Sequence, residues 1–237
     1  MSKKLFITGT GTDIGKTYVT GLILKKLREC GKNAAYYKAA MSGNERGTDG
    51  SLIPGDALHV KTVSGISQPL EEMCPYVYEA AFSPHLAARL EGRLLEMDTV
   101  LRAFDAVCSK YDFITAEGSG GILCPLRFDS QRIGLEDFVR ARGLSSLLIA
   151  DAGLGTINSV VLTVEYMNAR KLPLKGIIFN HFEPGNILHE DNLIMCEALT
   201  GLKVLACVKA GDTDLELSAE QLEALYRTED ENDLVSI

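Results

Sequence analysis

A glycine-rich stretch near the amino terminus carries the residues best suited to bind phosphate. Residues Gly9 to Thr17 read GTGTDIGKT, follow the apolar run 5–7 and lead into a helical pattern from Thr17 to Cys30. A strand, a glycine-rich turn and a helix in this order form a phosphate-binding loop, in which backbone N–H groups point at phosphate oxygens. Lys16 would then reach the terminal phosphates of a nucleotide, and the Thr17 hydroxyl would be a ligand of Mg²⁺.

The spacing of the glycines in this loop departs from the common pattern by one residue. That pattern places its first glycine five residues before the glycine of Gly-Lys-Thr, a position that Thr10 occupies here, whereas Gly9 stands six residues before Gly15. The loop is therefore one residue longer than usual or lacks its first glycine. Because a strand precedes it and a helix follows, an ordinary solvent turn is disfavoured, and the sequence predicts binding of nucleotide phosphates.

Three carboxylates stand where they could complete a metal site with the loop threonine. Glu117 ends the buried strand 112–117 and is the best candidate, Asp56 at a loop-to-helix junction is second, and Asp151 at another strand end is a rival. Carboxylates are also common at such ends as helix caps, so each alone fits either role. The metal role gains weight because Mg²⁺ near phosphates needs oxygen ligands.

A lysine and a second glycine-rich turn could bind anionic reactants. Lys38 ends the second strand and precedes the small residues 39–43. A fixed cation there could hold an anion and stabilise charge on a transferring phosphoryl group, although a solvated lysine is the alternative. Residues 153–158, GLGTIN, start a helix after a strand, so their N–H groups and the helix dipole could form another anion site. A plain strand-to-helix turn accounts for this segment equally well.

Apolar runs alternate with helical patterns and predict the elements that position these residues. Further strands are predicted over residues 33–38, 112–117, 145–150, 174–180 and 203–208. Further helices are predicted over residues 56–63, 84–90, 98–110, 156–170, 191–199 and 218–226. Ser83 and Asp98 are predicted helix caps, and Ser218 with Gln221 has capping-box spacing. This alternation predicts an α/β fold with a doubly wound, mostly parallel sheet flanked by helices, of the P-loop nucleoside triphosphatase kind.

Length and composition fit one globular α/β domain spanning residues 1–237. The 237 residues are 46% hydrophobic and 24% charged, and the net charge of −8 argues against a general nucleic-acid binder. The acidic segment 228–233 is typical of a solvated chain end, and the sequence is compatible with an ordered or a disordered tail after about residue 227. Six scattered cysteines without a Cys-x-x-Cys pair favour thiols in a reducing cytosol, and no run reaches transmembrane length. We therefore expect a cytoplasmic protein with no membrane partner.

Taken together, these segments resemble the dethiobiotin synthetase family over roughly residues 4–208. The matching segments, which occur in the same order, are residues 9–17, 37–38, 42–43, 55–57, 83–88, 117–121, 154–158 and 176–180. A lengthened phosphate loop alone is shared with other families, whereas the ordered set is far more specific. The extra residue in the loop is this family's form of the motif.

The resemblance implies an ATP- and Mg²⁺-dependent ligase of biotin biosynthesis that forms carbon–nitrogen bonds. Its substrates would be 7,8-diaminopelargonate, CO₂ and ATP, and its products dethiobiotin, ADP and phosphate. CO₂ would add to one amine as a carbamate, and the carbamate oxygen would attack the γ-phosphate to give a carbamic–phosphoric anhydride. The second amine would then attack the carbonyl carbon, close the ureido ring and expel phosphate.

The resemblance also implies roles for residues at the matching positions. The catalytic groups would be Lys38, which holds the carbamate, together with Lys16 and Thr12. The residues expected to bind the nucleotide are Asp13, Ile14, Gly15, Lys16, Thr17, Tyr18 and, at the adenine, Asn180. Those expected to bind the substrate are Lys38, Ser42, Gly118, Gly155 and Asn158. Those expected to bind Mg²⁺ are Thr17, Asp56 and Glu117. Gly155 and Asn158 would bind the substrate carboxylate from the partner subunit, which implies a homodimer with shared sites.

Some positions depart from the family pattern. Ala39 stands where a proline is usual, Gly11 replaces an acidic residue in the loop, and Ser159 stands where a histidine often follows Asn158. The loop 208–212 also lacks a proline that is often found there. These departures bear on nucleotide preference and substrate affinity and leave the implied reaction in place.

Three other classes of P-loop protein fit the sequence less well. Amide-forming enzymes of cobalamin synthesis carry an appended glutaminase domain, for which this chain has no room. Partition- or septum-positioning ATPases, which work as dimerisation switches, carry a second lysine early in the loop, and the segment 9–12 has none. Regulatory GTPases read the base with Asn-Lys-x-Asp, which the segment 180–183, NHFE, does not supply.

Overall fold

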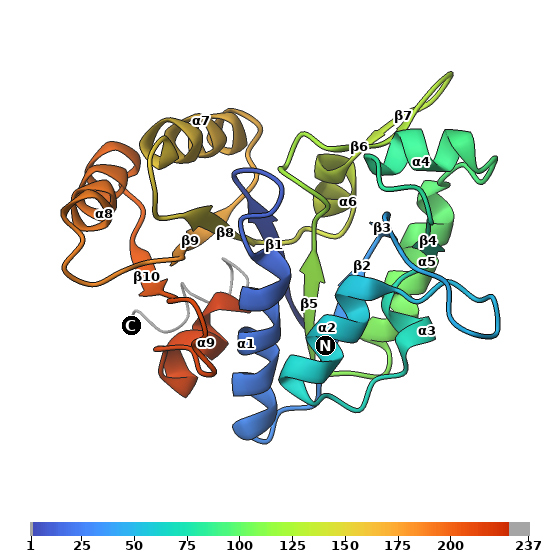
Figure 1. Cartoon of the computed structure of the whole chain (residues 1–237), viewed down its shortest axis with the longest axis horizontal. Helices are drawn as coiled ribbons and strands as arrows, with labels where there is room; N and C mark the ends of the chain where they lie inside the picture. The colour runs from blue at the N-terminus through green and yellow to red at the C-terminus, as the bar shows by residue number, and fades with distance from the viewer. Residues whose placement is uncertain (1, 228–237) are drawn as a thin grey trace.

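A six-stranded parallel sheet forms the centre of the structure, a computed structural model that describes residues 2–227 (Figure 1). The strands lie in the order β10-β9-β8-β1-β5-β2. Their bounds are β1 Lys3–Gly9, β2 Ala34–Lys38, β5 Phe113–Glu117, β8 Ser146–Asp151, β9 Leu174–Asn180 and β10 Val204–Cys207. The predicted doubly wound parallel sheet is therefore confirmed. The acidic segment 228–233 lies outside the described residues.

Helices cover both faces of the sheet because successive strand residues point to opposite sides. In β1, Leu5 and Ile7 face the first layer of helices, and Phe6 faces the second. The first layer consists of α1 Lys16–Glu29, α2 Gly55–Ser64, α3 Leu70–Met73 and α9 Ala219–Leu225. The second consists of α5 Met97–Cys108, α6 Leu135–Ala141, α7 Thr156–Ala169 and α8 Ile187–Thr200. In Figure 1, α7 and α8 lie together at the upper left.

A group of aromatic side chains fixes the second layer on the sheet. The ring of Phe138 in α6 lies 6.2 Å from Phe6, 5.8 Å from Tyr37 and 5.2 Å from Phe104, centre to centre. All four side chains are fully buried, and burial of each stabilises the fold by roughly 2–3 kcal/mol. Because Phe6 and Tyr37 belong to β1 and β2, this group also holds together the strands that carry the candidate site.

The strand order places a crevice at the carboxyl end of β1. β1 pairs with β5 on one side and with β8 on the other, so the chain leaves the central strand in both directions. In open α/β sheets, ligands bind at such a point of reversal, beyond the carboxyl ends of the strands. The loop between β1 and α1 begins here, at the upper end of α1 in Figure 1.

The outer edge of β2 is completed by a side chain. The backbone N–H of Tyr36 donates to Oε1 of Gln68 at 2.7 Å, and Nε2 of Gln68 donates to the carbonyl of Tyr36 at 3.0 Å. The buried amide of Gln68 thus takes the place of another strand and satisfies both groups. This contact fixes the strand two residues before its last residue, Lys38.

The predicted helix starts are partly correct. The capping box of α9 is confirmed, because Ser218 Oγ accepts from Gln221 N–H at 3.1 Å and Gln221 Oε1 accepts from Ser218 N–H at 2.9 Å. Ser83 precedes α4 Pro84–Leu90 as predicted, but its hydroxyl lies 3.0 Å from Nδ1 of His85 and caps no backbone N–H. The prediction for Asp98 is wrong, since α5 begins at Met97 after extended Glu96 and Asp98 lies in the first turn.

Several short elements were not predicted. They are the strands β3 Ala40–Met41 and β4 Tyr76–Val77, which pair in parallel, the hairpin of β6 Pro125–Phe128 with β7 Arg132–Gly134, and the helices α3 and α6. α8 begins at Ile187, four residues before the predicted start, because the Asn186 side chain accepts from Leu188 N–H at 3.1 Å. Among the described residues no helix is both long and apolar enough to cross a bilayer.

Candidate active site

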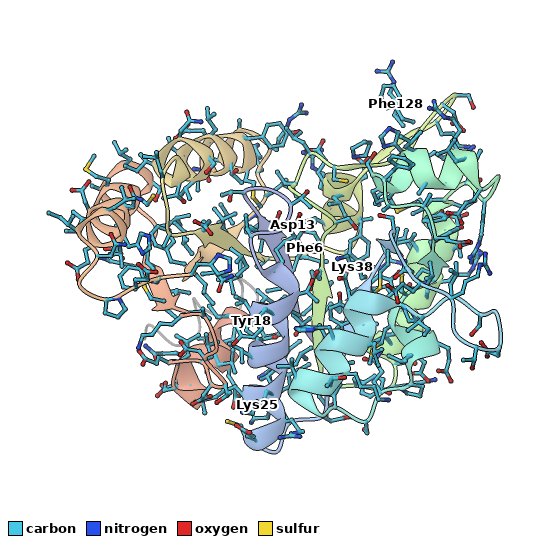
Figure 2. All side chains as sticks on the ribbon, viewed as in Figure 1. Phe6, Asp13, Tyr18, Lys25, Lys38 and Phe128 are labelled. Atoms are coloured by element: carbon cyan, nitrogen blue, oxygen red, sulfur yellow. The ribbon has the colours of Figure 1, made fainter. Side chains whose placement is uncertain are left out.

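The glycine-rich loop is held in a conformation that depends on Gly15. Gly15 has φ of 85° and directly precedes α1, and Asp13 in the same loop has φ of 58°. A Cβ atom at residue 15 would lie 2.0 Å from Nδ2 of Asn180, which is too close for any side chain. Only glycine combines this backbone conformation with the close approach of β9. Asp13 lies at the upper end of α1 in Figure 2.

Lys16 and the start of α1 form a site suited to phosphate. Nζ of Lys16 donates to the carbonyl of Gly11 in the same loop at 2.6 Å. Burial lowers the pKa of Lys16, and the positive charge of Lys38 lowers it further, against the opposing effect of Glu117. The first N–H groups of the 14-residue helix α1 have no partner within the helix and carry the positive end of its dipole. A bound phosphate would satisfy these donors and the lysine together.

Beside the loop, two carboxylates enclose a lysine. Nζ of Lys38 lies 2.6 Å from Oδ2 of Asp56 and 2.8 Å from Oε1 of Glu117. The pairing of β2 with β5 places Lys38 directly opposite Glu117. Thr17 Oγ1 donates to Glu117 Oε1 at 2.9 Å and lies 3.5 Å from Asp56 Oδ1. Residues from two strands and two helices therefore meet at one point, which Lys38 marks in Figure 2.

The charges of this cluster stabilise one another. Burial by itself lowers the pKa of Lys38, but the carboxylates of Glu117 and Asp56 outweigh burial and raise it above the ordinary value of 10.5. Burial likewise opposes ionisation of Asp56, yet the charge and hydrogen bond of Lys38 lower the pKa of this carboxyl below 3.8. At neutral pH, Lys38 is therefore a cation and Asp56 an anion.

The oxygens of the cluster fit a hard divalent cation. Thr17, Asp56 and Glu117 present a hydroxyl and two carboxylates at one place. The second oxygen of Glu117, Oε2, is buried and makes no hydrogen bond within the described residues. Oxygen ligands of this kind suit Mg²⁺, which usually takes one or two carboxylates together with water and phosphate oxygens. Asp151, the rival metal ligand, instead lies 2.6 Å from His181 and accepts from Gly153 N–H at 2.7 Å.

Two adjoining hollows open beside the loop and the cluster. The first has a volume of about 410 Å³, and its lining includes Lys16, Thr17, Lys38, Asp56 and Glu117. The second, of about 470 Å³, extends towards the start of α4 and reaches Phe82, Pro84 and Cys124. Both hollows are lined by Thr12, Asp13, Ser42, Ser119 and Gly120. A ligand longer than a triphosphate could therefore extend from one hollow into the other.

Not all predicted site residues line these hollows. Gly118 is buried, and a Cβ atom there would meet Phe6 at 2.9 Å, so its neighbours Ser119 and Gly120 form the wall instead. Gly155 and Asn158 line a separate groove at the start of α7. One chain therefore does not bring the predicted carboxylate site together with the phosphate loop.

The predicted nucleotide residues Tyr18 and Asn180 lie on the other side of the loop. The Tyr18 hydroxyl donates to the carbonyl of Asp212 and so links α1 to the segment after β10. Nδ2 of Asn180 donates to the carbonyl of Ile14 at 3.0 Å. Sequence reasoning did not assign site roles to the neighbouring lining residues Met41, Phe82, Ser119, Gly120 and Cys124. Met41 lies among the small residues 39–43 and Ser119 and Gly120 lie in the matching segment 117–121, whereas Phe82 and Cys124 carried no signal in the sequence.

Known proteins resemble this chain along nearly its whole length. A family model described as an AAA domain matches residues 3–213. A protein named ATP-dependent dethiobiotin synthetase BioD from Brachyspira hyodysenteriae is 46% identical over 227 residues, which cover 95% of this chain and 100% of the relative. A protein of the same name from Clostridium perfringens is 44% identical, covering 95% of this chain and 99% of the relative.

Solved structures with a similar fold are more distant in sequence. The MinC:MinD cell division protein complex of Aquifex aeolicus contains a chain with a TM-score of 0.53 and 11% identity, covering 88% of this chain and 81% of that one. A ParA family ATPase from Chlorobium tepidum has a TM-score of 0.52 and 11% identity, and the match covers 95% of this chain and 89% of that one. These structures share the P-loop fold alone, whereas the relatives above share close sequence identity over the full length. The chain belongs to the ATP-dependent dethiobiotin synthetase family.

Proposed function

We propose that this chain closes the ureido ring of dethiobiotin from 7,8-diaminopelargonate, CO₂ and ATP through a carbamate and a carbamic–phosphoric anhydride. As a member of this family it is an ATP-dependent ligase that forms carbon–nitrogen bonds. The observation that carries the detailed proposal is the cluster of Lys38, Asp56 and Glu117 beside the phosphate loop. One domain supplies both the nucleotide half of the site and the group that faces the reacting carbamate.

The loop and α1 would bind the triphosphate. Lys16 would exchange the carbonyl of Gly11 for phosphate oxygens, and the backbone around Gly15 would donate its N–H groups. Thr17, Asp56 and Glu117 would hold Mg²⁺, which, when bound, neutralises charge on the phosphate oxygens. Tyr18 and Asn180, beyond the start of α1, would border the base.

Lys38 would hold the carbamate in line with the γ-phosphate. Its raised pKa keeps it protonated, so it can pair with an anion but cannot act as a base. The amine would add to CO₂ and release one proton to water, which gives the anionic carbamate. No base is then needed for phosphoryl transfer, because the carbamate oxygen is already anionic when it attacks phosphorus and ADP departs. Thr12 and Ser42 line the same hollow and would orient the reacting group. Catalysis would then consist mainly of alignment and neutralisation of charge.

In the second step, the free amine attacks the carbonyl carbon of the anhydride, and phosphate departs with the bonding electrons of the carbon–oxygen bond. The amine loses one proton as the ring closes, which the leaving phosphate can accept. Lys38 and Lys16 would stabilise the negative charge of that phosphate. The second hollow, towards Ser83 and Pro84, offers room for the aliphatic chain of the substrate.

We further propose that two copies of the chain share their sites. The groove at the start of α7 has a volume of about 470 Å³ and is lined by Leu154, Gly155, Asn158, Leu162 and Leu199 among others. Leu154 is 91% exposed, Leu162 62% and Leu199 51%, which is unusual for adjacent leucines on one face. A second copy would cover them and place Gly155 and Asn158 where they can bind the substrate carboxylate of its partner.

Release of phosphate from ATP tests this function directly. We expect release to require diaminopelargonate and bicarbonate together and to match the dethiobiotin formed. Hydrolysis that needs neither substrate, and that a protein partner or a membrane stimulates, would refute the proposal and favour a partition-type ATPase. Each nucleoside triphosphate is assayed in turn, with and without Mg²⁺.

A further inference from the structure

Asn180, the last residue of β9, uses both of its amide hydrogens inside the protein. Its side chain is 1% exposed. Nδ2 lies 3.0 Å from the carbonyl oxygen of Ile14 and 3.1 Å from Nε2 of His181. Because a carbonyl can only accept, the amide nitrogen must face Ile14, and the orientation of the amide follows. The carboxamide oxygen Oδ1 is buried and has no hydrogen-bond partner among residues 2–227.

The proton on His181 is placed by the same contacts. Nδ2 of Asn180 can only donate, so Nε2 of His181 must accept and carries no proton. The ring proton is then on Nδ1, which lies 2.6 Å from Oδ2 of Asp151 and donates to it. His181 also has φ of 56°, a left-handed conformation that is uncommon outside glycine and marks a constrained position.

Asp151 is itself held in place. It ends β8 directly opposite Asn180 in β9, and its Oδ1 accepts from Gly153 N–H at 2.7 Å. Burial would raise the pKa of this carboxyl, but the hydrogen bonds from His181 and Gly153 outweigh burial and lower it. A continuous hydrogen-bonded chain thus runs from Gly153 through Asp151, His181 and Asn180 to Ile14 in the phosphate loop.

We infer that Asp151 and His181 are positioning residues that, together with the Ile14 carbonyl, hold the Asn180 amide with its oxygen unpaired among residues 2–227, and so make the nucleotide site select a base with an exocyclic amine. This inference rests on the proposed placement of the base at Asn180. A free carboxamide oxygen accepts from an amino group, as in adenine. The same oxygen repels a carbonyl at that position, as in hypoxanthine or guanine.

The test compares binding of ATP and inosine triphosphate, which differ by an amino group or an oxygen at carbon 6. His181→Asn keeps a donor for Asp151 and tolerates the left-handed backbone, but it is too short to present an acceptor to Asn180. We expect its preference for ATP, as a ratio of dissociation constants, to fall about tenfold, which corresponds to about 1.4 kcal/mol. His181→Gln presents an oxygen near the position of Nε2 and should restore most of the ratio.

The variant Asp151→Asn tests the same inference independently, because it changes the partner of His181 and leaves His181 itself in place. Its oxygen can still accept from Gly153 N–H, so its amide nitrogen faces Nδ1 of His181. Nδ1 must then accept, so the ring proton moves to Nε2 and opposes the Asn180 N–H group, which the Ile14 carbonyl still holds. Without the contact to His181 the amide is held at one point only, and we expect the preference of this variant for ATP to fall about as far as in His181→Asn. A purely structural role for Asp151 would weaken both nucleotides alike.

The matched control is His189→Asn, the same change at a histidine whose Nδ1 accepts from Glu183 N–H without touching Asn180. It should keep the ratio of the unaltered protein. An unchanged ratio in folded His181→Asn and Asp151→Asn would overturn the inference, as would a protein that binds both nucleotides equally. If the unaltered protein prefers ATP in binding but forms no dethiobiotin, the proposed function fails while the inference stands. If ring closure proceeds but the variants keep the ratio, only the inference fails.

Discussion

Replacement of Lys38 by methionine tests the ion cluster on which the proposed chemistry depends. Methionine is unbranched and apolar and fills much of the same space, so the main change is the loss of the charge between Asp56 and Glu117. Lys38 is 5% exposed and Glu117 1%, so the remaining Glu117 carboxylate would be buried without its cation. Removal of one partner from a buried pair destabilises proteins by about 3–5 kcal/mol.

The lower end of that range applies here because the Asp56 side chain is 39% exposed and water compensates it in part. We therefore expect the free energy of unfolding to fall by about 3 kcal/mol. For a chain of this length, about 1 kcal/mol shifts Tm by about 2–4 °C, so Tm should fall by about 6–12 °C. Because the cation no longer occupies the carboxylates, Mg²⁺ should raise Tm of Lys38→Met more than Tm of the unaltered protein.

The double variant Lys38→Met with Glu117→Gln tests whether the unpaired Glu117 carboxylate causes the lower stability of Lys38→Met. If an orphaned carboxylate produces the loss, the double variant should be more stable than the sum of the single changes predicts, by about 1.5 kcal/mol or more. Additive losses within about 0.5 kcal/mol, or a single variant as stable as the unaltered protein, would refute the electrostatic reasoning. Ring formation by Lys38→Met should fall at least about 100-fold while ATP binding changes little, since Lys16 and α1 remain.

The pH dependence of this stabilisation follows from the two shifted groups. The pKa of Lys38 is raised, so its contribution is complete below 10.5 and is lost only as pH rises through the higher folded value. The pKa of Asp56 is lowered, so its contribution is complete above 3.8 and is lost as pH falls through the lower folded value. The difference in Tm between the unaltered protein and the double variant Lys38→Met with Glu117→Gln, which leaves no buried orphaned carboxylate, should therefore be constant from about pH 5 to about pH 9.

Three further changes test other parts of the site. Gly15→Ala adds a Cβ atom 2.0 Å from Asn180 Nδ2 at φ of 85°, so it should lower stability by about 2 kcal/mol or more and abolish ATP binding, as measured by thermal unfolding and calorimetry. Leu162→Glu places a charge on the groove at α7 and should shift the protein to a monomer in sedimentation, with ring closure lost and ATP binding kept; a dimer with full activity would contradict the shared site. Alkylation of Cys124, a thiol in the second hollow whose pKa burial raises, should be slow and should stop when diaminopelargonate is bound, as followed by mass spectrometry with exposed Cys30 as the internal control.

The sequence predicted the sheet and the phosphate loop because both depend on short-range patterns. Apolar runs of strand length and the spacing of Gly15, Lys16 and Thr17 are read within a few residues, and parallel strands bring their carboxyl ends to one edge. The same rule brings Lys38 and Glu117, which end β2 and β5, to one edge of the sheet. Their direct pairing at 2.8 Å depends on the register of β2 against β5, which local sequence does not encode.

The parts that were not predicted have both local and tertiary causes. α6 contains only seven residues, and its start is fixed by Asp137, which accepts from Gly134 N–H at 2.8 Å. Asp98 looked like a cap because of its residue type, but Glu96 has the extended backbone that precedes the helix. The Asp151–His181 contact joins strand ends 30 residues apart, so neither residue signalled its partner. Asp151 was therefore predicted as a possible metal ligand from its position at a strand end alone.

Lys38 would have two kinds of partner in turn, which are the carboxylates of Asp56 and Glu117 and, during the reaction, the carbamate. Two lysines, Lys16 and Lys38, and two carboxyl groups, Asp56 and Glu117, line the same hollow, and Lys38 pairs with both carboxyl groups. While Lys38 is paired with both carboxylates, they compensate its positive charge, and it would attract a carbamate only weakly. It becomes available only when another cation takes over Asp56 and Glu117, and Thr17 provides the third oxygen for that cation. Under the proposed mechanism, the site would bind the carbamate well only after the metal–nucleotide complex has entered, and phosphoryl transfer would be coupled to carbamate binding. ATP without its metal would leave Lys38 paired with its two carboxylates.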